Sequence, residues 1–577
     1  MPTTIEVNKQ SVEALLGSGK SKPFVIPEYQ RPYAWTDEQV ETLFEDLWDF
    51  TATSGGTERE SSYFLGSVVS YENEDGEQEI IDGQQRITSL FLLLRAIYTK
   101  LVATPASERT AEANNFIGKI EPTIWRTNKL TGTVDFKNIL LTSRVVNNEG
   151  NEILRSILET GKADEDAKDN YSKNYRHFQE LFDKHSTENP LMVYQFIYAL
   201  LNQAILLPIT ADTQDTALTI FSTLNDRGLP LSDADIFKAK IYNQLAPDDK
   251  KAFIDRWKDL DEQSTDANES IQQLFYYNMF YYRALDKDTK TTTPGVRKYY
   301  AVNKFERLYK PELLDTLFVI LNLWKVVNKG EELEDEAWSK NIKIRQTLDI
   351  LTSYPNEYWK YPVVIYYVCY RNEENFETRF ARFLNKLLME LMTKYLMIPT
   401  INAVKPDILK LNSAIVASDI PTFEFKTVDM TQLEPYIQNP NRNVVRMLLK
   451  TLAYEHQDDL LPAKWEIEHI FPQKWQTNYF PDEPDATIKE KIEHIGNKLP
   501  FEKKLNIVAG NGYFGKKKKE YIASKIVITK AMGTSDVMDW NLESITKRDI
   551  RVSDEVVKIM NRWNNEYLNT PVSEGKA

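Results

Sequence analysis

The sequence predicts an α+β protein with more than one domain, and three observations support this prediction. The chain has 577 residues, too many for one ordinary hydrophobic core. Strand-like segments precede helical ones near both ends, around residues 63–101 and 465–506, while residues 246–440 carry long helical patterns rich in aromatic residues. We therefore expect three parts, which are 1–245, 246–440 and 441–577.

The composition excludes several classes of protein. A hydrophobic share of 42% and an aromatic share of 12% are typical of a globular chain. A net charge of −14 argues against a protein that coats nucleic acid indiscriminately. One cysteine excludes an internal disulfide and zinc-ribbon patterns. We find no signal segment and no apolar run of membrane-spanning length, so we expect a cytoplasmic protein without a membrane partner.

The first notable segment, residues 25–35, reads Val-Ile-Pro-Glu-Tyr-Gln-Arg-Pro-Tyr-Ala-Trp. Two prolines predict a stiff, extended stretch. Thr36 and Asp37 then cap a helix with an apolar face. Taken alone, the segment indicates only a packed N-terminal arm.

A second segment leads from a strand at residues 78–82 into an apolar helix at 87–101. The turn between them places two amides and an arginine at a helix N-terminus, where backbone donors and the helix dipole favour phosphate. Arg86 can bind phosphate through two hydrogen bonds, and Asp82 could position a metal ion or water. A tight strand-to-helix turn without a ligand is the structural alternative. The candidate cofactor-binding residues here are Asp82, Gly83, Gln84, Gln85 and Arg86.

The third segment, residues 221–238, predicts a polar turn between helices. Its candidate nucleotide-binding residues are Asn225, Arg227 and Lys238. A capped interhelical turn is the plain alternative if the other two segments are ignored.

Together the three segments resemble the DUF262 domain, which is related to the ParB and sulfiredoxin folds. The shared motifs are Ile-Pro-Glu-Tyr-Gln-Arg-Pro-Tyr, Ile-Asp-Gly-Gln-Gln-Arg and Leu-Asn-Asp-Arg-Gly followed by Leu-Ser. The resemblance implies binding and hydrolysis of a nucleoside triphosphate (ATP, GTP or another) around residues 82–86. No Walker lysine motif occurs, so this would not be a P-loop enzyme.

The aromatic stripes of residues 246–440 favour a helical core. A stacking surface for a flipped or single-stranded base is the alternative.

The stretch 465–506 carries the residues that suit phosphodiester hydrolysis. It reads Trp-Glu-Ile-Glu-His-Ile-Phe-Pro-Gln, then His-Ile-Gly-Asn-Lys-Leu-Pro, and continues to Asn506. The reaction needs a base to activate water and a divalent cation to stabilise the charge on phosphate. His469 is the candidate base, and Glu468 is a candidate oxygen ligand for Mg²⁺ or Mn²⁺. Asn497 would orient the imidazole, and Asn506 would supply a second oxygen to the metal.

The plain alternative is an ordinary strand end followed by turn-forming asparagines. Adjacent side chains on a regular strand also point to opposite faces. Glu468 and His469 can therefore share one phosphate only if the backbone bends between them.

In order and type these residues resemble the HNH, or ββα-metal, nucleases, in the variant called DUF1524. The resemblance implies a strand with the acid–histidine pair, a second strand with Asn497 and a helix with Asn506. The closing histidine that is frequent in the family is missing, so the metal role falls on Asn506, with Asn511 as a weaker candidate. His494 is interpreted as structural.

A basic stretch follows this motif. Residues 495–530 contain nine lysines and two glutamates. Four of the lysines are consecutive, namely Lys516, Lys517, Lys518 and Lys519. A solvated helix face is the usual meaning of such a run. Beside a candidate phosphodiesterase, contact with the DNA backbone is the favoured interpretation.

A DUF262 domain joined to this HNH variant resembles the GmrSD family of type IV restriction enzymes. The resemblance implies cleavage of phage DNA that carries modified bases, such as glucosylated hydroxymethylcytosine, under nucleotide control. Expected partners are double-stranded DNA, a nucleotide and a second copy of the chain in a homodimer. Two alternatives stay open, a phosphorothioation-linked defence nuclease and a nucleotide-dependent DNA-binding switch whose HNH domain is inactive.

Overall fold

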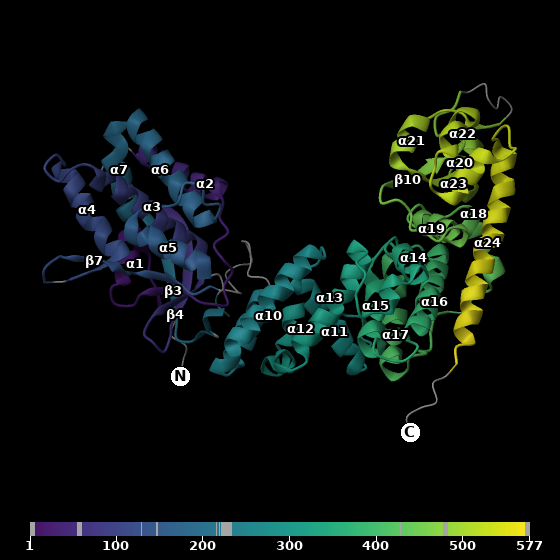
Figure 1. Cartoon of the computed structure of the whole chain (residues 1–577), viewed down its shortest axis with the longest axis horizontal. Helices are drawn as coiled ribbons and strands as arrows, with labels where there is room; N and C mark the ends of the chain where they lie inside the picture. The colour runs from purple at the N-terminus through teal and green to yellow at the C-terminus, as the bar shows by residue number, and fades with distance from the viewer. Residues whose placement is uncertain are drawn as a thin grey trace. The chain divides into compact units, whose positions relative to one another are not determined.

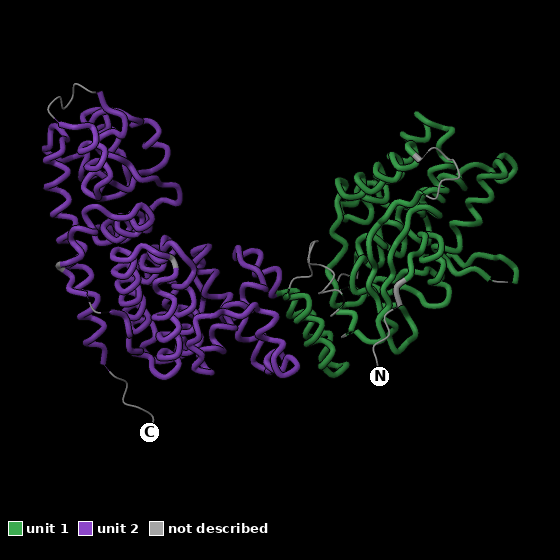
Figure 2. Tube along the Cα trace, turned by 180° about the vertical axis from the view of Figure 1, so that it is seen from behind, with its two compact units in different colours: residues 1–259 green, residues 260–577 purple. Residues whose placement is uncertain are grey.

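The computed structural model describes all residues except 1–5, 55–60, 129, 146–147, 215, 219, 221–232, 427, 477–482 and 572–577. The chain forms two compact units, residues 1–259 and 260–577 (Figure 2). Both contain helices and strands, which confirms the predicted α+β multidomain class. The expected division of residues 246–577 at position 440 stays a prediction.

Unit 1 holds a β-sheet and the helices that cover it. Its elements are β1 (Glu6–Val7), β2 (Gln10–Ser11), α1 (Val12–Ser18), β3 (Phe24–Ile26), α2 (Asp37–Ser54), β4 (Tyr63–Glu72), β5 (Gln78–Asp82), α3 (Gln84–Ala103), α4 (Ala111–Ile124), β6 (Trp125–Thr127), β7 (Val134–Ile139), β8 (Leu141–Ser143), α5 (Asn148–Thr160), α6 (Asn170–Glu188), η1 (Pro190–Met192), α7 (Val193–Tyr198), η2 (Ala199–Gln203), β9 (Ala204–Ala211), α9 (Asp233–Gln244) and α10 (Pro247–Asp266).

Within the described residues, seven strands form one mixed sheet in the order β1-β9-β4-β5-β3-β8, with β2 also paired to β9. Strand β3 runs parallel to both β5 and β8, so these three strands end at the same edge. The residues that follow β3 and β5, 27–31 and 83–86, therefore leave the sheet together. Ligands of open α/β sheets commonly bind at such an edge.

Both faces of this sheet are buried. Val68 and Ile80 pack on one side into the core around α3, whereas Val69 and Ile81 pack on the other side with Ala239 of α9. Alternating residues of β4 and β5 thus serve two different cores.

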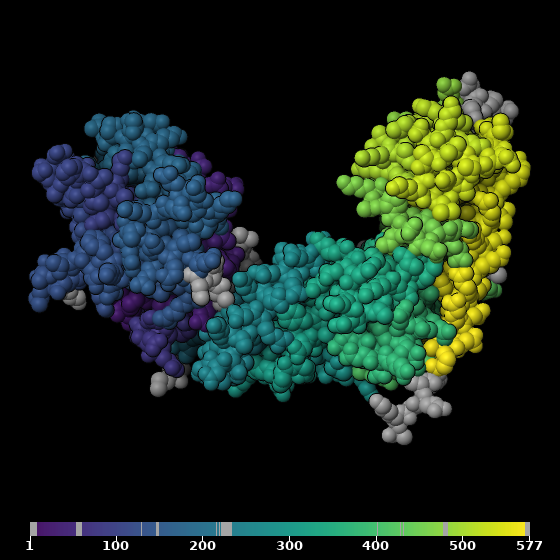
Figure 3. All heavy atoms as spheres, viewed as in Figure 1, coloured from purple at the N-terminus to yellow at the C-terminus, as the bar shows by residue number. Residues whose placement is uncertain are grey.

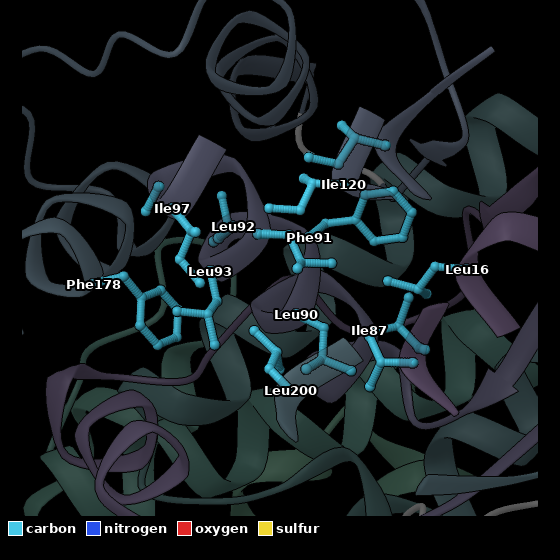
Figure 4. Packing of buried hydrophobic residues seen from close by; sticks show 14 of the residues in the cluster. Leu16, Ile87, Leu90, Phe91, Leu92, Leu93, Ile97, Ile120, Phe178 and Leu200 are labelled. Carbon is cyan, nitrogen blue, oxygen red and sulfur yellow. The ribbon is translucent and has the colours of Figure 1, made fainter. Parts of the chain in front are cut away.

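Helix α3 is the centre of the larger core. Most of its side chains are buried, including the consecutive residues 87–98, so the helix is covered on all sides. Figure 4 shows Leu90, Phe91 and Ile97 of this helix in contact range of side chains from several neighbouring elements. The helix begins after Gly83, whose φ of 89° is a left-handed conformation that favours glycine.

Unit 2 is mostly helical. After the end of α10 its elements are α11 (Ile271–Leu285), α12 (Val296–Tyr300), η3 (Val302–Tyr309), α13 (Leu313–Lys329), η4 (Ala337–Lys340), α14 (Ile342–Leu351), η5 (Glu357–Trp359), α15 (Lys360–Tyr370), α16 (Phe376–Met397), η6 (Ile401–Val404), α17 (Lys405–Ala417), η7 (Met430–Leu433), α18 (Glu434–Gln438), α19 (Val445–His456), β10 (Trp465–His469), α20 (Asp485–Ile492), η8 (Ile495–Asn497), β11 (Lys498–Glu502), α21 (Lys503–Ala509), α22 (Phe514–Ile522), α23 (Val527–Thr534) and α24 (Leu542–Leu568).

The aromatic stripes of the helical region form its core, as predicted. On α11, Phe275, Tyr277 and Phe280 are buried, and the ring of Tyr277 stacks on Trp324 of α13 with centroids 4.9 Å apart. These rings are packed inside unit 2, so they offer no stacking surface to a base.

The last helix, α24, connects the two regions of unit 2. It packs on α16 of the helical region and on α19, α20 and η8 of the C-terminal region. In Figures 1 and 3 it runs as one yellow rod along both regions. The side chain of Asn541 caps its first turn by accepting from the Ser544 amide.

Among the described residues, no helix combines the length and apolar character needed to span a membrane.

Candidate functional site

His469 ends the strand β10, which pairs antiparallel with β11 so that His469 lies opposite Lys498. Its imidazole Nε2 is 3.6 Å from Oε1 of Glu493 and 3.4 Å from Nε2 of Gln473. Helix α21 follows β11 directly and packs on both strands. Two antiparallel strands and a helix are the arrangement that the resemblance to ββα-metal nucleases led us to expect.

The partly buried position of His469 favours a neutral imidazole. Burial lowers the pKa of His469 below its usual 6.5, and it outweighs the opposing influence of Glu493. Burial alone would raise the pKa of the Glu493 carboxyl, but Lys498 and His469 lower it overall. The Lys498 ammonium lies 2.9 Å from Oε2 of Glu493. A neutral imidazole beside an ionised carboxylate is suited to accept a proton.

Glu468 does not share the His469 side of the strand, and this corrects its predicted role. Its side chain is buried, where Oε1 accepts a hydrogen bond of 2.6 Å from Tyr521 and lies 2.8 Å from the Lys517 ammonium. Both partners come from α22. The strand stays regular, so its alternation points the two adjacent side chains in opposite directions. Because its carboxylate is engaged in the interior, Glu468 does not fit as a metal ligand.

Asn497 makes contacts that differ from the predicted one to the imidazole. The side chain is completely buried. Its Oδ1 accepts from the Phe471 amide at 2.7 Å and from the Trp540 indole at 3.2 Å, and its Nδ2 donates to the Phe471 and Ile492 carbonyls at 3.0 Å each. All four hydrogen-bonding positions of the amide are thus used. Asn497 fixes the backbone two residues beyond His469 and does not touch the ring.

Helix α24 braces the turn that carries Asn497. Nη1 of Arg548 donates to the carbonyls of Ile495, Gly496 and Lys498 at 2.8–3.1 Å. Oδ1 of Asp549 accepts from the Gly496 amide at 2.7 Å. A Cβ at position 496 would lie 2.3 Å from the Ile545 carbonyl oxygen, so only glycine fits this close approach.

His494 also contacts α24, which agrees with its interpretation as a structural residue. Its Nδ1 is 2.8 Å from Oδ2 of the buried Asp549, which Lys491 also approaches to 3.2 Å.

The other predicted metal ligand, Asn506, lies half-buried on α21 as expected. Asn511, the weaker candidate, is exposed, and its amide is bonded to the backbone of Lys474. Within the described part of the chain, no three His, Cys, Asp or Glu side chains gather closely enough to hold a metal ion. The metal role of Asn506 stays a prediction.

The four consecutive lysines lie in different environments because they occupy different faces of α22. Lys516 and Lys519 are exposed, as a DNA contact requires. Lys517 is buried against Glu468 and donates to the His469 carbonyl at 2.5 Å, which corrects its prediction as a DNA contact. The Lys518 ammonium donates to the Ser535 and Val537 carbonyls and so supports a loop.

In unit 1, three charged side chains converge at the end of β5. Burial raises the pKa of Asp82, and the Gly83 amide, Arg86 and Arg31 oppose that rise. Burial lowers the pKa of Arg86, against the influence of Asp82. Nη1 of Arg86 donates to the Ser67 carbonyl at 3.0 Å, while Arg31 is exposed. The cluster stands at the N-terminus of the 20-residue helix α3, which suits an anion.

Gln85 was predicted to bind nucleotide, but its amide holds the proline-rich arm. Its Oε1 accepts from the amides of Ala34 and Trp35 at 2.7 and 3.2 Å, and its Nε2 donates to the Pro32 carbonyl at 3.1 Å. Gln84 is also buried, and its Oε1 has no hydrogen-bond partner among the described residues. The arm of residues 25–35 is therefore fixed to the turn after β5.

The third predicted cluster lies partly outside the described residues, which exclude Asn225 and Arg227. Lys238 is described and lies half-buried on α9, which covers the sheet face opposite α3.

Comparison with protein families gives a match near each end of the chain. The N-terminal domain of the GmrSD restriction endonucleases matches residues 12–242, and the C-terminal domain of the same enzymes matches residues 429–552. Together these matches cover more than half of the chain. The protein belongs to the GmrSD family. It is a restriction-type DNA endonuclease, and DNA is its partner. A comparison with curated proteins gave no match.

Two residues of this GmrSD chain escaped the sequence interpretation. Glu493 precedes His494 and repeats the Glu-His pair of β10, yet only the histidine was considered. Arg31 belongs to the motif of the proline-rich arm, but no local pattern connects it to Asp82, since the pairing of β3 with β5 brings them together.

The buried state of Lys517 did have a signal in the sequence. Phe514, Lys517 and Tyr521 are spaced three and four residues apart, so they share one helix face with two aromatic rings.

Proposed function

We propose that His469 is the general base of a metal-dependent, HNH-type DNA endonuclease whose targets are modified bases in phage DNA. The observation that carries the proposal is the half-buried His469 imidazole at the end of β10, whose Nε2 lies 3.6 Å from Oε1 of Glu493 and whose pKa is lowered by burial. It stands in a strand–strand–helix arrangement in the region that the GmrSD C-terminal domain matches. The targets, such as glucosylated hydroxymethylcytosine, follow from the family resemblance.

Glu493 is the positioning residue in this proposal. Nε2 of His469 faces the Glu493 carboxylate, so a proton on Nε2 is stabilised there. The second ring nitrogen, Nδ1, is then free of its proton and takes one from the attacking water. Lys498 keeps Glu493 ionised and in place.

A divalent cation, Mg²⁺ or Mn²⁺, belongs to the proposal because it would stabilise the charge that develops on phosphate. Glu468 does not contribute a ligand, since Lys517 and Tyr521 occupy its carboxylate. Among the predicted ligands, Asn506 remains as an oxygen donor from α21.

We also propose that the turn at residues 82–86 binds a nucleoside triphosphate that controls cleavage. Arg86 and the exposed Arg31 supply positive charge beside Asp82, at the N-terminus of α3. Arg86 also supports the sheet through Ser67, so its replacement affects packing as well as binding. Arg31→Ala is the cleaner probe. It should weaken nucleotide binding at least about tenfold, since charge-assisted hydrogen bonds contribute strongly.

The nucleotide site is tested by titrating fluorescent ATP and GTP analogues into wild type, Arg31→Ala and Arg86→Ala. Lys137→Ala, an exposed change on β7, is the matched control. If both arginine variants bind nucleotide as the control does, and cleavage responds to nucleotide equally in all four proteins, the site is elsewhere.

The nuclease assignment is tested with His469→Ala on plasmid DNA containing glucosylated hydroxymethylcytosine, phosphorothioates or no modification. Loss of a general base should reduce the cleavage rate by about 10²–10⁴. His177→Ala, in unit 1, is the matched control and should cut normally. Undiminished cleavage by His469→Ala would remove the proposal. Cleavage confined to phosphorothioate DNA would instead favour the backbone-reading alternative.

A further inference from the structure

A cavity of about 780 Å³ opens in unit 2. Hydrogen bonds connect it to the backbone near His469, because Trp540 in its lining donates to Asn497, which also accepts from the Phe471 amide. Helices α19, α23 and α24 and the segment between α23 and α24 form its walls. Pockets for small organic ligands span about 300–1,000 Å³, so this space would hold a base with a substituent.

The floor of the cavity is apolar. Leu452, Met532 and Val552 line it and are nearly buried, and the Trp540 ring closes one wall. Apolar and aromatic walls with a few placed polar groups are typical of sites for flat organic rings.

The α24 side of the cavity is positively charged. Arg551 and Lys547 line it and are exposed, and the buried Arg548 lies between them in the helix. Lys547 is paired with Glu543. No ion pair to the Arg551 guanidinium is found among the described residues, so its charge is available to an anion. The one acidic group in the lining, Glu555, is bonded to His456 at 2.6 Å.

The walls of this cavity also support the turn that carries Asn497. Trp540 donates to Asn497, which holds the backbone at Phe471, two residues beyond His469. Arg548 donates to three carbonyls around the same turn. A ligand that contacts Trp540 or Arg548 would therefore affect the backbone next to His469, the proposed general base.

We propose that this cavity receives one nucleotide turned out of the DNA duplex, with its base on the apolar floor and a flanking phosphate at Arg551. Charge and shape both favour a nucleotide as the occupant. The cationic side chains match its phosphate, and the apolar floor of the cavity matches its ring. The inference rests on the proposed DNA cleavage at His469, and it adds the site at which the modification would be read.

The test uses the full-length protein in EDTA, which separates binding from cleavage. Two duplexes of one sequence carry 2-aminopurine, in one case paired and in the other opposite a mismatched base. A mismatched base is easier to turn out, so wild type should bind that duplex about tenfold or more tightly, with brighter 2-aminopurine emission.

Variants that fill the cavity should abolish this preference. Ala531→Trp places a ring in the cavity from α23, and Val537→Trp does so from the loop that follows, in case the first variant fails to fold. Both should bind the paired duplex as wild type does. Ile550→Trp adds the same ring at an exposed position of α24 outside the cavity and should keep the preference.

The phosphate contact is tested separately. Arg551→Ala should weaken binding of the mismatched duplex, whereas Lys558→Ala, an exposed change on the same helix outside the cavity, should not. Equal binding of the two duplexes by a wild-type protein that still cuts DNA through His469 would overturn the cavity assignment alone. A preserved mismatch preference together with cleavage that does not need His469 would support the cavity and refute the proposed function.

Discussion

Replacing Lys517 with methionine should destabilise unit 2 and should leave the affinity for DNA phosphates unchanged. The Lys517 side chain is 1% exposed, and the Glu468 side chain that it neutralises is 4% exposed. Removing one partner of a buried ion pair leaves an uncompensated charge, which costs about 3–5 kcal/mol. At about 2–4 °C per kcal/mol, the loss corresponds to a decrease of roughly 6–20 °C in Tm.

The exposed neighbours provide the matched contrast. Lys516→Ala and Lys519→Ala should change stability by no more than about 0.5 kcal/mol. If these side chains contact DNA phosphates, each variant should reduce the slope of log affinity against log salt by about 0.9. Calorimetry and DNA binding at several salt concentrations measure both quantities on the same samples.

The double variant Glu468→Gln/Lys517→Met completes the test. It removes both charges, so it should recover a large part of the stability that the single Lys517 variant loses. If Lys517→Met is as stable as wild type and reduces the salt slope instead, Lys517 is a DNA contact and the buried pair does not describe the protein in solution.

Four further predictions concern the site around His469. Because burial lowers its pKa below 6.5 and the base must be neutral, the cleavage rate should fall with decreasing pH only below 6.5. Glu493→Gln removes an influence that raises the pKa of His469, so the acidic limb of the rate profile should move to lower pH, and a shift to higher pH would contradict the assignment. Asn497→Ala loses four buried hydrogen bonds and should destabilise unit 2 by about 2–6 kcal/mol in urea unfolding, so an unchanged midpoint would show that these bonds do not form. EDTA should stop cleavage, and Mg²⁺ or Mn²⁺ should restore it better than Zn²⁺, whereas full activity in excess chelator would exclude the metal.

Much of the fold was accessible from local patterns. The strand at residues 78–82 and the apolar helix after Gly83 were placed correctly, because each has an apolar pattern and a clear turn signal. The strand that carries Glu468 and His469 was implied by the family resemblance. The aromatic core of α11 was predicted for the same reason.

The side-chain roles were less accessible, because they depend on elements far apart in the sequence. Asn497 was expected beside His469, but the partners that complete its hydrogen bonding, Phe471 and Trp540, are 26 and 43 residues away in the chain. Glu468 was expected to hold a metal, yet its partners Lys517 and Tyr521 lie on a helix that a motif ending at residue 506 does not include. The motif thus located the two strands and the turn, whereas several hydrogen-bond partners of Glu468 and Asn497 lie outside the residues it includes.

The brace from α24 has a consequence for the timing of activity during protein synthesis. Residues 494–498 owe their shape to Arg548 and Asp549, which the ribosome adds about fifty residues later. A nascent chain that has already folded β10 and β11 still lacks this support, so the turn at residues 494–498 is incomplete until α24 has left the exit tunnel. A chain cut short before residue 548 should therefore lack an ordered turn at residues 494–498.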